Sequence, residues 1–313
     1  MNKQKNEDLI EYYNGIENSI EIENIYKNKA QILLEALPYI KDYFNKIVVV
    51  KLGGTIMEDD DSLKRVLDDL ILMKYVGINV VIIHGGGKQI TKLMEEKNIK
   101  VEFCDGMRVT NKDTIDIVKM VLLGEINSKI VSFLNRHGEI AVGLSGNDAN
   151  FVNCRKKTYK KDDKEIDLGF VGEIIKINKS FLLNILNNGY IPVIATLGSD
   201  NKGNIYNINA DTFACEIASN LNAKKMILLT DVDGIKLKIN SNEKLISKIS
   251  VSMCRRLIES QDINKGMIPK VNACIDALTN GVERTHILNG MSEHSILIEI
   301  FTDKGIGTMI VKD

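Results

Sequence analysis

The sequence predicts a three-layer αβα fold whose central sheet is open and mostly parallel. Two observations lead to this fold class. Short β-branched runs, such as residues 47–50, recur along the chain and end in glycines, as buried strands do where they enter loops. Segments with apolar residues at helical spacing separate these runs. Because alternating strands and helices form right-handed βαβ units, the strands become neighbours in a sheet that helices cover on both faces.

Length and composition exclude several classes of protein. The 313 residues suffice for about two domains, and a 44% hydrophobic, 27% charged chain is typical of soluble globular proteins. The 41 basic and 42 acidic residues nearly cancel, so we expect no nucleic-acid partner. No apolar run approaches the roughly 18 residues that cross a bilayer, and the N-terminus lacks a signal-peptide centre. We therefore expect a cytoplasmic protein with no membrane partner, and five cysteines without a CxxC pair predict reduced thiols.

The first predicted elements follow one another closely. Residues 1–28 form a polar, Asn-rich extension, for which a loose amphipathic helix and a disordered segment both remain open. Helical spacing of apolar residues begins at Lys29. A buried strand then ends at Gly53, Ser62 caps the next helix, and a second strand ends at His84 before three glycines.

The later elements repeat this pattern. Thr110 to Asp113 has the spacing of a capping box and opens a long helix that Gly138 closes. Residues 151–176 are charged and predict an antiparallel hairpin excursion. Three more strand-to-loop junctions follow at residues 141–146, 189–198 and 224–234, and residues 211–222 and 252–260 are predicted to be helices between them.

Glycines gather where the predicted strands end. In open α/β sheets, ligands lie outside the carboxyl ends of the strands. Five such junctions on one edge of the sheet predict an anion-binding edge. The glycines concerned are Gly53, Gly54, Gly85, Gly86, Gly87, Gly143, Gly146, Gly198 and Gly234.

Two lysines stand beside these loops. Lys51 ends the first strand, where glycine amides let an anion approach the backbone closely. Lys270 follows a proline, which restrains the backbone and so aims the long side chain. The glycines after His84 precede a helix and favour an anion there; the alternative, an esterase oxyanion hole, requires a GxSxG elbow that the sequence lacks. His84 itself is interpreted as a packed, hydrogen-bonded histidine.

Other polar residues have both a structural and a functional interpretation. Arg108 precedes a helix, where a guanidinium suits bidentate carboxylate recognition. Asp211 opens a helix, either as part of an N-cap or as an acidic organiser between two lysines. Asp231 and Asp233 end a strand, and they either form an Asx turn or position a ribose or Mg²⁺.

Seven motifs in order resemble the amino-acid kinase superfamily, with its carbamate kinase-like fold, and within it the N-acetyl-L-glutamate kinases. The motifs are KLGG, HGGG, GMRVT, LGFVGEI, YNINADTFA, LLTDVDG and GMIPKV, and the resemblance covers about residues 30–313. It implies phosphorylation of the γ-carboxylate of N-acetyl-L-glutamate by ATP with Mg²⁺, in arginine biosynthesis. It also implies a lobe over 29–224 for the acyl acceptor and a lobe over 225–313 for the nucleotide.

The resemblance assigns roles residue by residue. Lys51 and Lys270 would neutralise the transition state, and Asp211 would organise them. The acceptor would bind at Gly85, Gly86, Arg108 and Asn207. The nucleotide would bind at Gly53, Gly54, Thr230, Asp231, Asp233, Gly234, Gly266 and Met267, with no protein ligand assigned to the metal. Since an ionised carboxylate needs no general base, positioning and charge neutralisation would carry the reaction.

Two features resemble the arginine-inhibited, hexameric branch of these kinases. The N-terminal extension would be an oligomerisation arm in a trimer of dimers, and His286, Glu299 and Gly305 would border an L-arginine site. The sequence departs from that branch at Asn289–Met291, where an acidic-Gly-Arg tripeptide is usual, and in its longer N-terminus. A PII-type regulator is a further partner that this resemblance raises. A kinase of acetylaminoadipate and a non-catalytic arginine sensor remain the alternatives.

Overall fold

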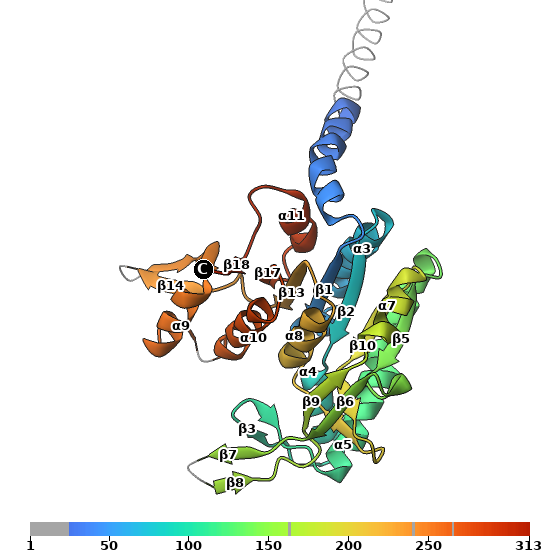
Figure 1. The fold of residues 1–313 in the computed structure, drawn as a ribbon, viewed down its shortest axis with the longest axis vertical. Helices are drawn as coiled ribbons and strands as arrows, with labels where there is room; N and C mark the ends of the chain where they lie inside the picture. The colour runs from blue at the N-terminus through green and yellow to red at the C-terminus, as the bar shows by residue number, and fades with distance from the viewer. Residues whose placement is uncertain (1–24, 162–163, 240–241, 265) are drawn as a thin grey trace, which may run out of the picture. The chain divides into compact units, whose positions relative to one another are not determined.

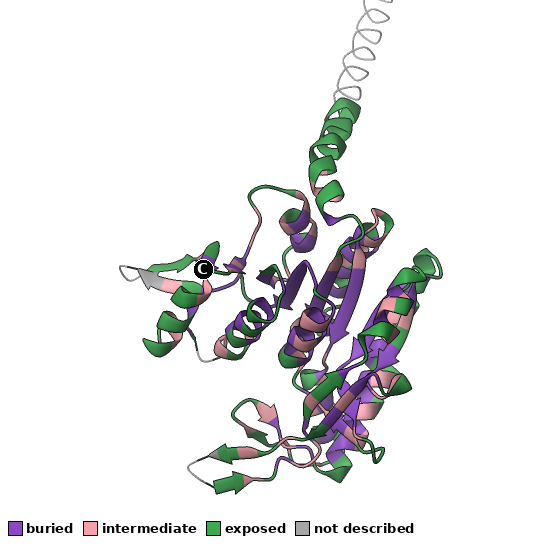
Figure 2. Cartoon of the chain, in the orientation of Figure 1, coloured by how far each residue is buried: buried purple, intermediate pink, exposed green. Residues whose placement is uncertain are grey.

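The computed structural model describes residues 25–161, 164–239, 242–264 and 266–313. Most of the predicted extension over residues 1–28 therefore lies outside the described residues. The chain divides into two compact units, Met1–Asp42 and Tyr43–Asp313. A helix covers residues 25–43, and Figure 2 shows that most of its surface is exposed. Within the part of the chain that the structure describes, no helix is long and apolar enough to cross a membrane.

An eight-stranded sheet forms the centre of the second unit (Figure 1). Its strands are parallel except where β18 runs antiparallel to β17, so the predicted mostly parallel sheet is confirmed. In spatial order the strands are β16 (Lys248–Ser250), β18 (Thr308–Val311), β17 (Arg284–Asn289), β13 (Lys225–Thr230), β1 (Ile47–Leu52), β2 (Asn79–His84), β10 (Ile191–Ala195) and β5 (Ala141–Ser145).

Helices cover both faces of this sheet, which confirms the three layers. Side chains alternate along β1, so Val48 and Val50 pack on one face and Val49 packs on the other. One face holds α3 (Asp60–Tyr75), α4 (Gly87–Glu96), α5 (Lys112–Lys119), α6 (Ser128–Leu134) and α11 (Ser295–Phe301). The other holds α7 (Lys179–Asn187), α8 (Ala210–Asn220), α9 (Val251–Glu259) and α10 (Ile268–Thr279). A short helix, α2 (Gly54–Glu58), follows β1.

Two predicted helix caps are wrong. Asp59, not Ser62, caps α3 by accepting a hydrogen bond from the Ser62 N–H, and Ser62 is buried within the helix. Asn111, not Thr110, caps α5, because the Thr110 backbone is bonded to the segment around Gly169. The predicted long helix is present, but its middle is a π-helix, η1 (Met120–Asn127). A 3₁₀ turn over Asn135–His137 ends it at Gly138, whose φ is +129°.

The predicted antiparallel excursion is confirmed as part of a second sheet. There β6 (Val152–Lys156) pairs antiparallel with β9 (Gly172–Ile177), beside β11 (Leu197–Ser199) and β12 (Ile205–Asn207). A 3₁₀ turn over Asp148–Asn150 precedes β6. Among the described residues, three further antiparallel pairs form two-stranded sheets: β3 (Phe103–Cys104) with β4 (Met107–Arg108), β7 (Tyr159–Lys161) with β8 (Lys164–Ile166), and β14 (Lys236–Ile239) with β15 (Asn242–Leu245).

Candidate active site

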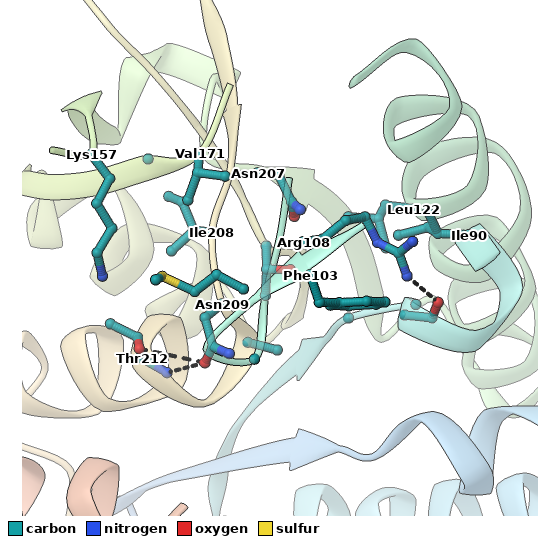
Figure 3. A pocket seen from close by; sticks show the side chains of 18 residues that line it. Ile90, Phe103, Arg108, Leu122, Lys157, Val171, Asn207, Ile208, Asn209 and Thr212 are labelled. Atoms are coloured by element: carbon teal, nitrogen blue, oxygen red, sulfur yellow. Dashed lines mark hydrogen bonds between the residues drawn. The ribbon is translucent and has the colours of Figure 1, made fainter. Parts of the chain in front are cut away.

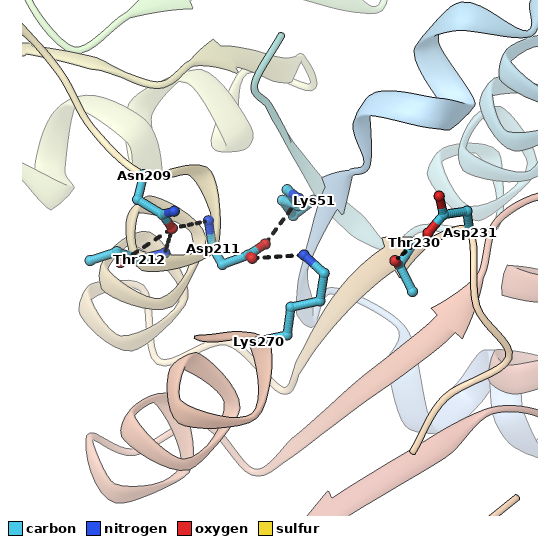
Figure 4. Close-up of polar contacts among 7 residues, drawn as sticks. All are labelled: Lys51, Asn209, Asp211, Thr212, Thr230, Asp231 and Lys270. Carbon is cyan, nitrogen blue, oxygen red and sulfur yellow. Dashed lines mark hydrogen bonds and ion pairs between the residues drawn. The ribbon is translucent and has the colours of Figure 1, made fainter. Parts of the chain in front are cut away.

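Three charged residues far apart in sequence meet at the carboxyl edge of the sheet (Figure 4). Strand alternation places Lys51 on the same face of β1 as Val49, where α8 and α10 pack. Asp211 lies in the first turn of α8 between the two lysines. The Lys51 Nζ lies 2.9 Å from Asp211 Oδ1, and the Lys270 Nζ lies 2.8 Å from Oδ2. The structure thus brings together the three residues that the sequence assigned to catalysis.

Burial and charge shift the pKa values of Asp211 and Lys51. Burial alone would raise the pKa of Asp211, but the charges and hydrogen bonds of Lys51 and Lys270 outweigh it and hold that pKa at about 2. Burial is also the main cause that lowers the pKa of Lys51, and Asp211 opposes it. The carboxylate stays ionised at neutral pH and fixes both ammonium groups.

The residue before this turn, Asn209, caps the N-terminus of α8. It accepts hydrogen bonds from the Asp211 and Thr212 backbone N–H groups at 3.0 and 3.1 Å. The cap residue thereby leaves the Asp211 side chain free to meet the lysines. The predicted N-cap is confirmed at Asn209, and Asp211 lies between the two lysines, where its role as an organiser stays a prediction.

One cavity of about 200 Å³ lies beside this turn (Figure 3). The four residues predicted for the acceptor, Gly85, Gly86, Arg108 and Asn207, all line it. We call it the acceptor cavity. The other lining residues are Gly87, Ile90, Phe103, Gly106, Met107, Leu122, Lys157, Val171, Gly172, Thr196, Ile208, Asn209, Ala210 and Thr212.

Arg108 is held firmly in the wall of the acceptor cavity. Its Nη2 donates to the Gly87 carbonyl and to Thr91 Oγ1, each at 2.7 Å, and its guanidinium lies 4.7 Å from the centre of the Phe103 ring. Burial lowers the pKa of this guanidinium without removing its charge. A side chain oriented in this way presents a fixed positive group to the cavity.

Packing explains one of the cavity glycines. A Cβ on Gly86 would lie 2.6 Å from Ile126 Cδ1 and 2.8 Å from Leu122 Cδ2, both in the π-helix. Only glycine allows the loop to approach η1 this closely. His84, just before the loop, is buried and hydrogen-bonded to Asn127, and burial lowers its pKa to about 4. It is a packed histidine, as predicted.

A second cavity, of about 430 Å³, gathers residues predicted for the nucleotide. We call it the nucleotide cavity. Lys270 lines it as well, so this lysine connects the cavity with Asp211. The predicted residues on its wall are Thr230, Asp231, Gly234, Gly266 and Met267, and the others are Val232, Ile235, Lys236, Glu243, Ile263 and Asn264.

Three residues predicted for the nucleotide do not line this cavity. Gly53 packs against β13, where a Cβ would lie 2.6 Å from the Leu229 carbonyl oxygen, and Gly54 lies beside the Lys88 stem. Asp233 pairs with Lys236 and accepts a hydrogen bond from Asn289 at 2.9 Å. Asn289, at the unusual tripeptide, thus holds the loop after β13. The nucleotide roles of these three residues stay predictions.

The three residues predicted for an arginine site also lie together. His286 Nε2 and Lys225 Nζ lie 2.5 and 2.9 Å from the same oxygen, Glu299 Oε1. Gly305 has φ +48°, and a Cβ there would lie 2.5 Å from Glu299 Oε2. Burial lowers the pKa of His286 to about 4 against the pull of Glu299, so the ring is neutral at pH 7. We call Lys225, His286 and Glu299 the C-terminal cluster.

Sequence reasoning missed several polar residues. Lys225 was not singled out because it begins an apolar strand, next to a second lysine. Lys157 was hidden in a run of charged residues, although it lines the acceptor cavity. Thr55 donates to Asp231 at 2.8 Å, and only its place after Gly54 gave a signal.

Comparison with known proteins defines the family. Residues 46–289 match the model of the Amino acid kinase family. Acetylglutamate kinase of Methanocaldococcus jannaschii is 49% identical over 290 residues, which cover 91% of this chain and 97% of that protein.

Solved structures agree on the fold. An N-acetylglutamate synthase from Neisseria gonorrhoeae, complexed with coenzyme A and N-acetyl-glutamate, has a TM-score of 0.81 and 26% identity over 91% of this chain and 63% of its own. A carbamate kinase from Giardia lamblia bound to AMP-PNP has a TM-score of 0.62 at 19% identity, over 86% of this chain and 99% of its own, and shows the shared fold alone.

The chain therefore belongs to the amino acid kinases, and within them to the acetylglutamate kinases. The predicted family and the predicted fold are both confirmed. Membership makes the protein a kinase that transfers a phosphoryl group to a carboxyl acceptor. The hexameric, arginine-inhibited branch stays a prediction.

Proposed function

We propose that this kinase uses ATP to phosphorylate the γ-carboxylate of N-acetyl-L-glutamate, in arginine biosynthesis. One observation supports the location of the reaction. Asp211 forms ion pairs with both Lys51 and Lys270, and these three residues lie between the two cavities. Asn209 and Ala210, just before Asp211, line the acceptor cavity, and Lys270 lines the nucleotide cavity. The phosphoryl group would pass from the nucleotide to the acceptor at Lys51, Asp211 and Lys270.

The reaction needs no proton transfer. A γ-carboxylate oxygen attacks the γ-phosphorus, the bond from that phosphorus to the β,γ-bridging oxygen breaks, and ADP leaves with the electron pair. The products are ADP and N-acetyl-L-glutamyl 5-phosphate. Two anions must meet in this step, so Lys51 and Lys270 act by neutralising charge, and Asp211 fixes them before substrates arrive.

Binding of the acceptor would fall to four residues. Arg108 would hold the α-carboxylate, Asn207 would donate to the amino-acid end or the acetamide, and the amides of Gly85 and Gly86 would face the reacting carboxylate. All lining residues of this cavity precede residue 225, and those of the nucleotide cavity follow it. This supports an acceptor lobe over 29–224 and a nucleotide lobe over 225–313.

Mg²⁺ would arrive with the nucleotide. Among the described residues, no group of three histidine, cysteine or acidic side chains is placed to hold a metal. Nucleotide-bound Mg²⁺ is usually coordinated by phosphate oxygens and water with only one or two carboxylates, so it needs no such group. When bound, it would neutralise phosphate charge; Asp231 is an ionised carboxylate on the nucleotide cavity that could reach it.

The direct test is ADP release from the full chain with Mg-ATP and one acceptor at a time. N-acetyl-L-glutamate, L-glutamate, L-aspartate and N-acetyl-L-aminoadipate would be compared, with hydroxylamine present to trap an acyl phosphate. We expect turnover and a hydroxamate with N-acetyl-L-glutamate alone. Turnover with N-acetyl-L-aminoadipate instead would replace the substrate assignment, and arginine binding without any turnover would favour the sensor alternative.

L-Arginine would bind at the C-terminal cluster and inhibit the enzyme. Glu299 supports this proposal because a carboxylate is the natural partner of a guanidinium group. Activity would be measured with increasing L-arginine. Inhibition by millimolar arginine is the expected result, and full activity under those conditions would contradict the site.

The chain would assemble through its N-terminal helix with further copies of itself. Large apolar side chains on residues 25–43 are exposed, with Leu33 and Ile32 at 71% and 64%. An apolar face of this kind needs a partner in water. We propose a dimer that assembles into a trimer of dimers, with a PII-type protein as a further partner. Light scattering on the full chain and on Leu33→Asp tests the assembly, which the substitution should reduce.

A further inference from the structure

The acceptor cavity is lined by positive charge without any negative charge among the described residues. Arg108 and Lys157 are its charged lining residues, and no carboxylate faces it. Figure 3 shows the two side chains on opposite sides of the cavity. A cavity that carries two separate cations suits a ligand that carries two separate anionic groups.

The backbone of Lys157 is held in place by the second sheet. Its N–H donates to the Val171 carbonyl at 2.8 Å, directly after Lys156 pairs with Gly172. The side chain therefore starts from a fixed point on the cavity wall and is only partly buried. It can adapt to a ligand without any change in the strand.

The two cations before Lys157 in sequence are already paired. Arg155 lies 2.7 Å from Glu173, and Lys156 lies 2.7 Å from Asp167. Lys157 forms no such ion pair with a carboxylate among the described residues. Of the three consecutive cations, two form ion pairs, and the third, Lys157, lines the cavity within coulombic range of Glu173.

We propose that Lys157 is a second cation that binds the acceptor, and that it pairs with the acceptor carboxylate that Arg108 does not hold. The inference rests on the proposed function, since it takes an acylated amino diacid as the ligand. Arg108 is locked by Gly87 and Thr91, so it provides the fixed half of the recognition, and Lys157 provides the adaptable half. Together they make the cavity select acceptors with two negative charges.

The test compares Lys157→Met with wild type in steady-state kinetics on the full chain. Methionine keeps the stem and removes the charge. Because a charged hydrogen bond to a carboxylate is lost, we expect KM for N-acetyl-L-glutamate to rise about 10- to 100-fold. KM for Mg-ATP should stay unchanged, and kcat should change far less than KM. Lys157→Arg should restore most of the affinity, which a purely structural role would not explain.

Lys160→Met is the matched control, since Lys160 is an exposed lysine on the adjacent β7. It should leave both KM values at the wild-type level. Lys157→Gln provides a second neutral variant should the methionine variant fail to fold. An unchanged KM for N-acetyl-L-glutamate in both neutral variants, or an equal rise in Lys160→Met, would overturn the proposal.

An acceptor whose α-carboxylate is replaced by a carboxamide identifies the paired group. If its KM is insensitive to Lys157→Met, Lys157 pairs with the α-carboxylate; if its KM rises as much as that of N-acetyl-L-glutamate, Lys157 pairs with the γ-carboxylate. The rise supports the proposal, because Arg108 is the proposed partner of the α-carboxylate; insensitivity would overturn the proposed pairing. A wild-type chain that phosphorylates no acceptor would instead overturn the proposed function, so the two failures are distinguishable.

Discussion

Two clusters in this molecule place a carboxylate between two nitrogen groups, and they differ in their access to solvent. Asp211 bridges Lys51 and Lys270, and the Lys270 side chain remains 20% exposed on the wall of a cavity. Glu299 bridges Lys225 and His286, whose side chains are 2% and 1% exposed. The first cluster therefore has one cation, Lys270, on the wall of a cavity, whereas the second has its charges closed within the fold.

The difference indicates separate uses for similar chemistry. Cations at a cavity wall can share their charge with an incoming phosphoryl group. A buried cation that loses its carboxylate partner destabilises the fold, and a ligand reaches the Lys225–Glu299 pair only by entering the cluster. Charge removal should therefore affect catalysis in the first cluster and folding in the second.

The largest expected effect is on catalysis at the open cluster. Lys51→Ala should reduce kcat by about 10²–10³, because one preorganised positive charge is lost where negative charge develops. The rate of ADP release at saturating substrates measures this. Lys64→Ala, an exposed lysine on α3, is the control and should keep the wild-type kcat. An unchanged kcat in Lys51→Ala would remove this lysine from the mechanism.

The second effect separates the two clusters. Glu299→Gln leaves the Lys225 ammonium buried without a charged partner, so the free energy of unfolding should fall by about 3 kcal/mol. Urea denaturation measures it, and kcat should stay near the wild-type value. Asp211→Asn is the matched variant of the open cluster and should lower kcat. Loss of kcat in Glu299→Gln without loss of stability would contradict the division.

A smaller effect concerns pH. His286 and His84 both have a pKa of about 4 in the folded chain, lowered chiefly by burial, against about 6.5 when unfolded. Between these values the unfolded chain binds more protons, so stability falls as the pH falls. His286→Asn should make this dependence shallower. The free energy of unfolding of the wild type and of His286→Asn would be measured from about pH 7 to about pH 4.5. An equal change with pH in the two proteins would show that His286 does not contribute to this dependence.

The smallest effect is expected at Gly305. Its φ of +48° disfavours any residue with a Cβ, and that Cβ would crowd the end of the Glu299 side chain. Gly305→Ala should cost about 1–2 kcal/mol of unfolding free energy. Thermal unfolding checks this value. Gly189→Ala is the matched comparison for Gly305→Ala, because Gly189 also has a positive φ but has open space around it.

Much of the fold was predictable because hydrophobic periodicity records it locally. The strand-to-glycine junctions at β1, β2 and β13 marked buried parallel strands, and these strands are neighbours in the sheet. The caps at Ser62 and Thr110 were wrong because several capping residues stand in a row at each site. Which of them caps depends on tertiary contacts that a local pattern does not contain.

The candidate site was predictable where family motifs mark it, and not elsewhere. Lys51, Asp211 and Lys270 stood in motifs, and the structure places them in contact. Lys157 and Lys225 carry no local signal, since strand register and packing alone bring them to a cavity and to Glu299. The π-helix was also hidden, because apolar spacing does not separate π from α geometry over one turn.

The central place of β1 has a consequence for the growing chain. It is the first strand among the described residues, yet one of its two edges pairs with β13, which begins only at Lys225. Until the ribosome has made that later strand, the backbone groups along this edge have no sheet partner. Unpaired apolar strands invite association with other chains. Newly made copies of this enzyme would therefore benefit from chaperones that shield β1 until the later strand emerges.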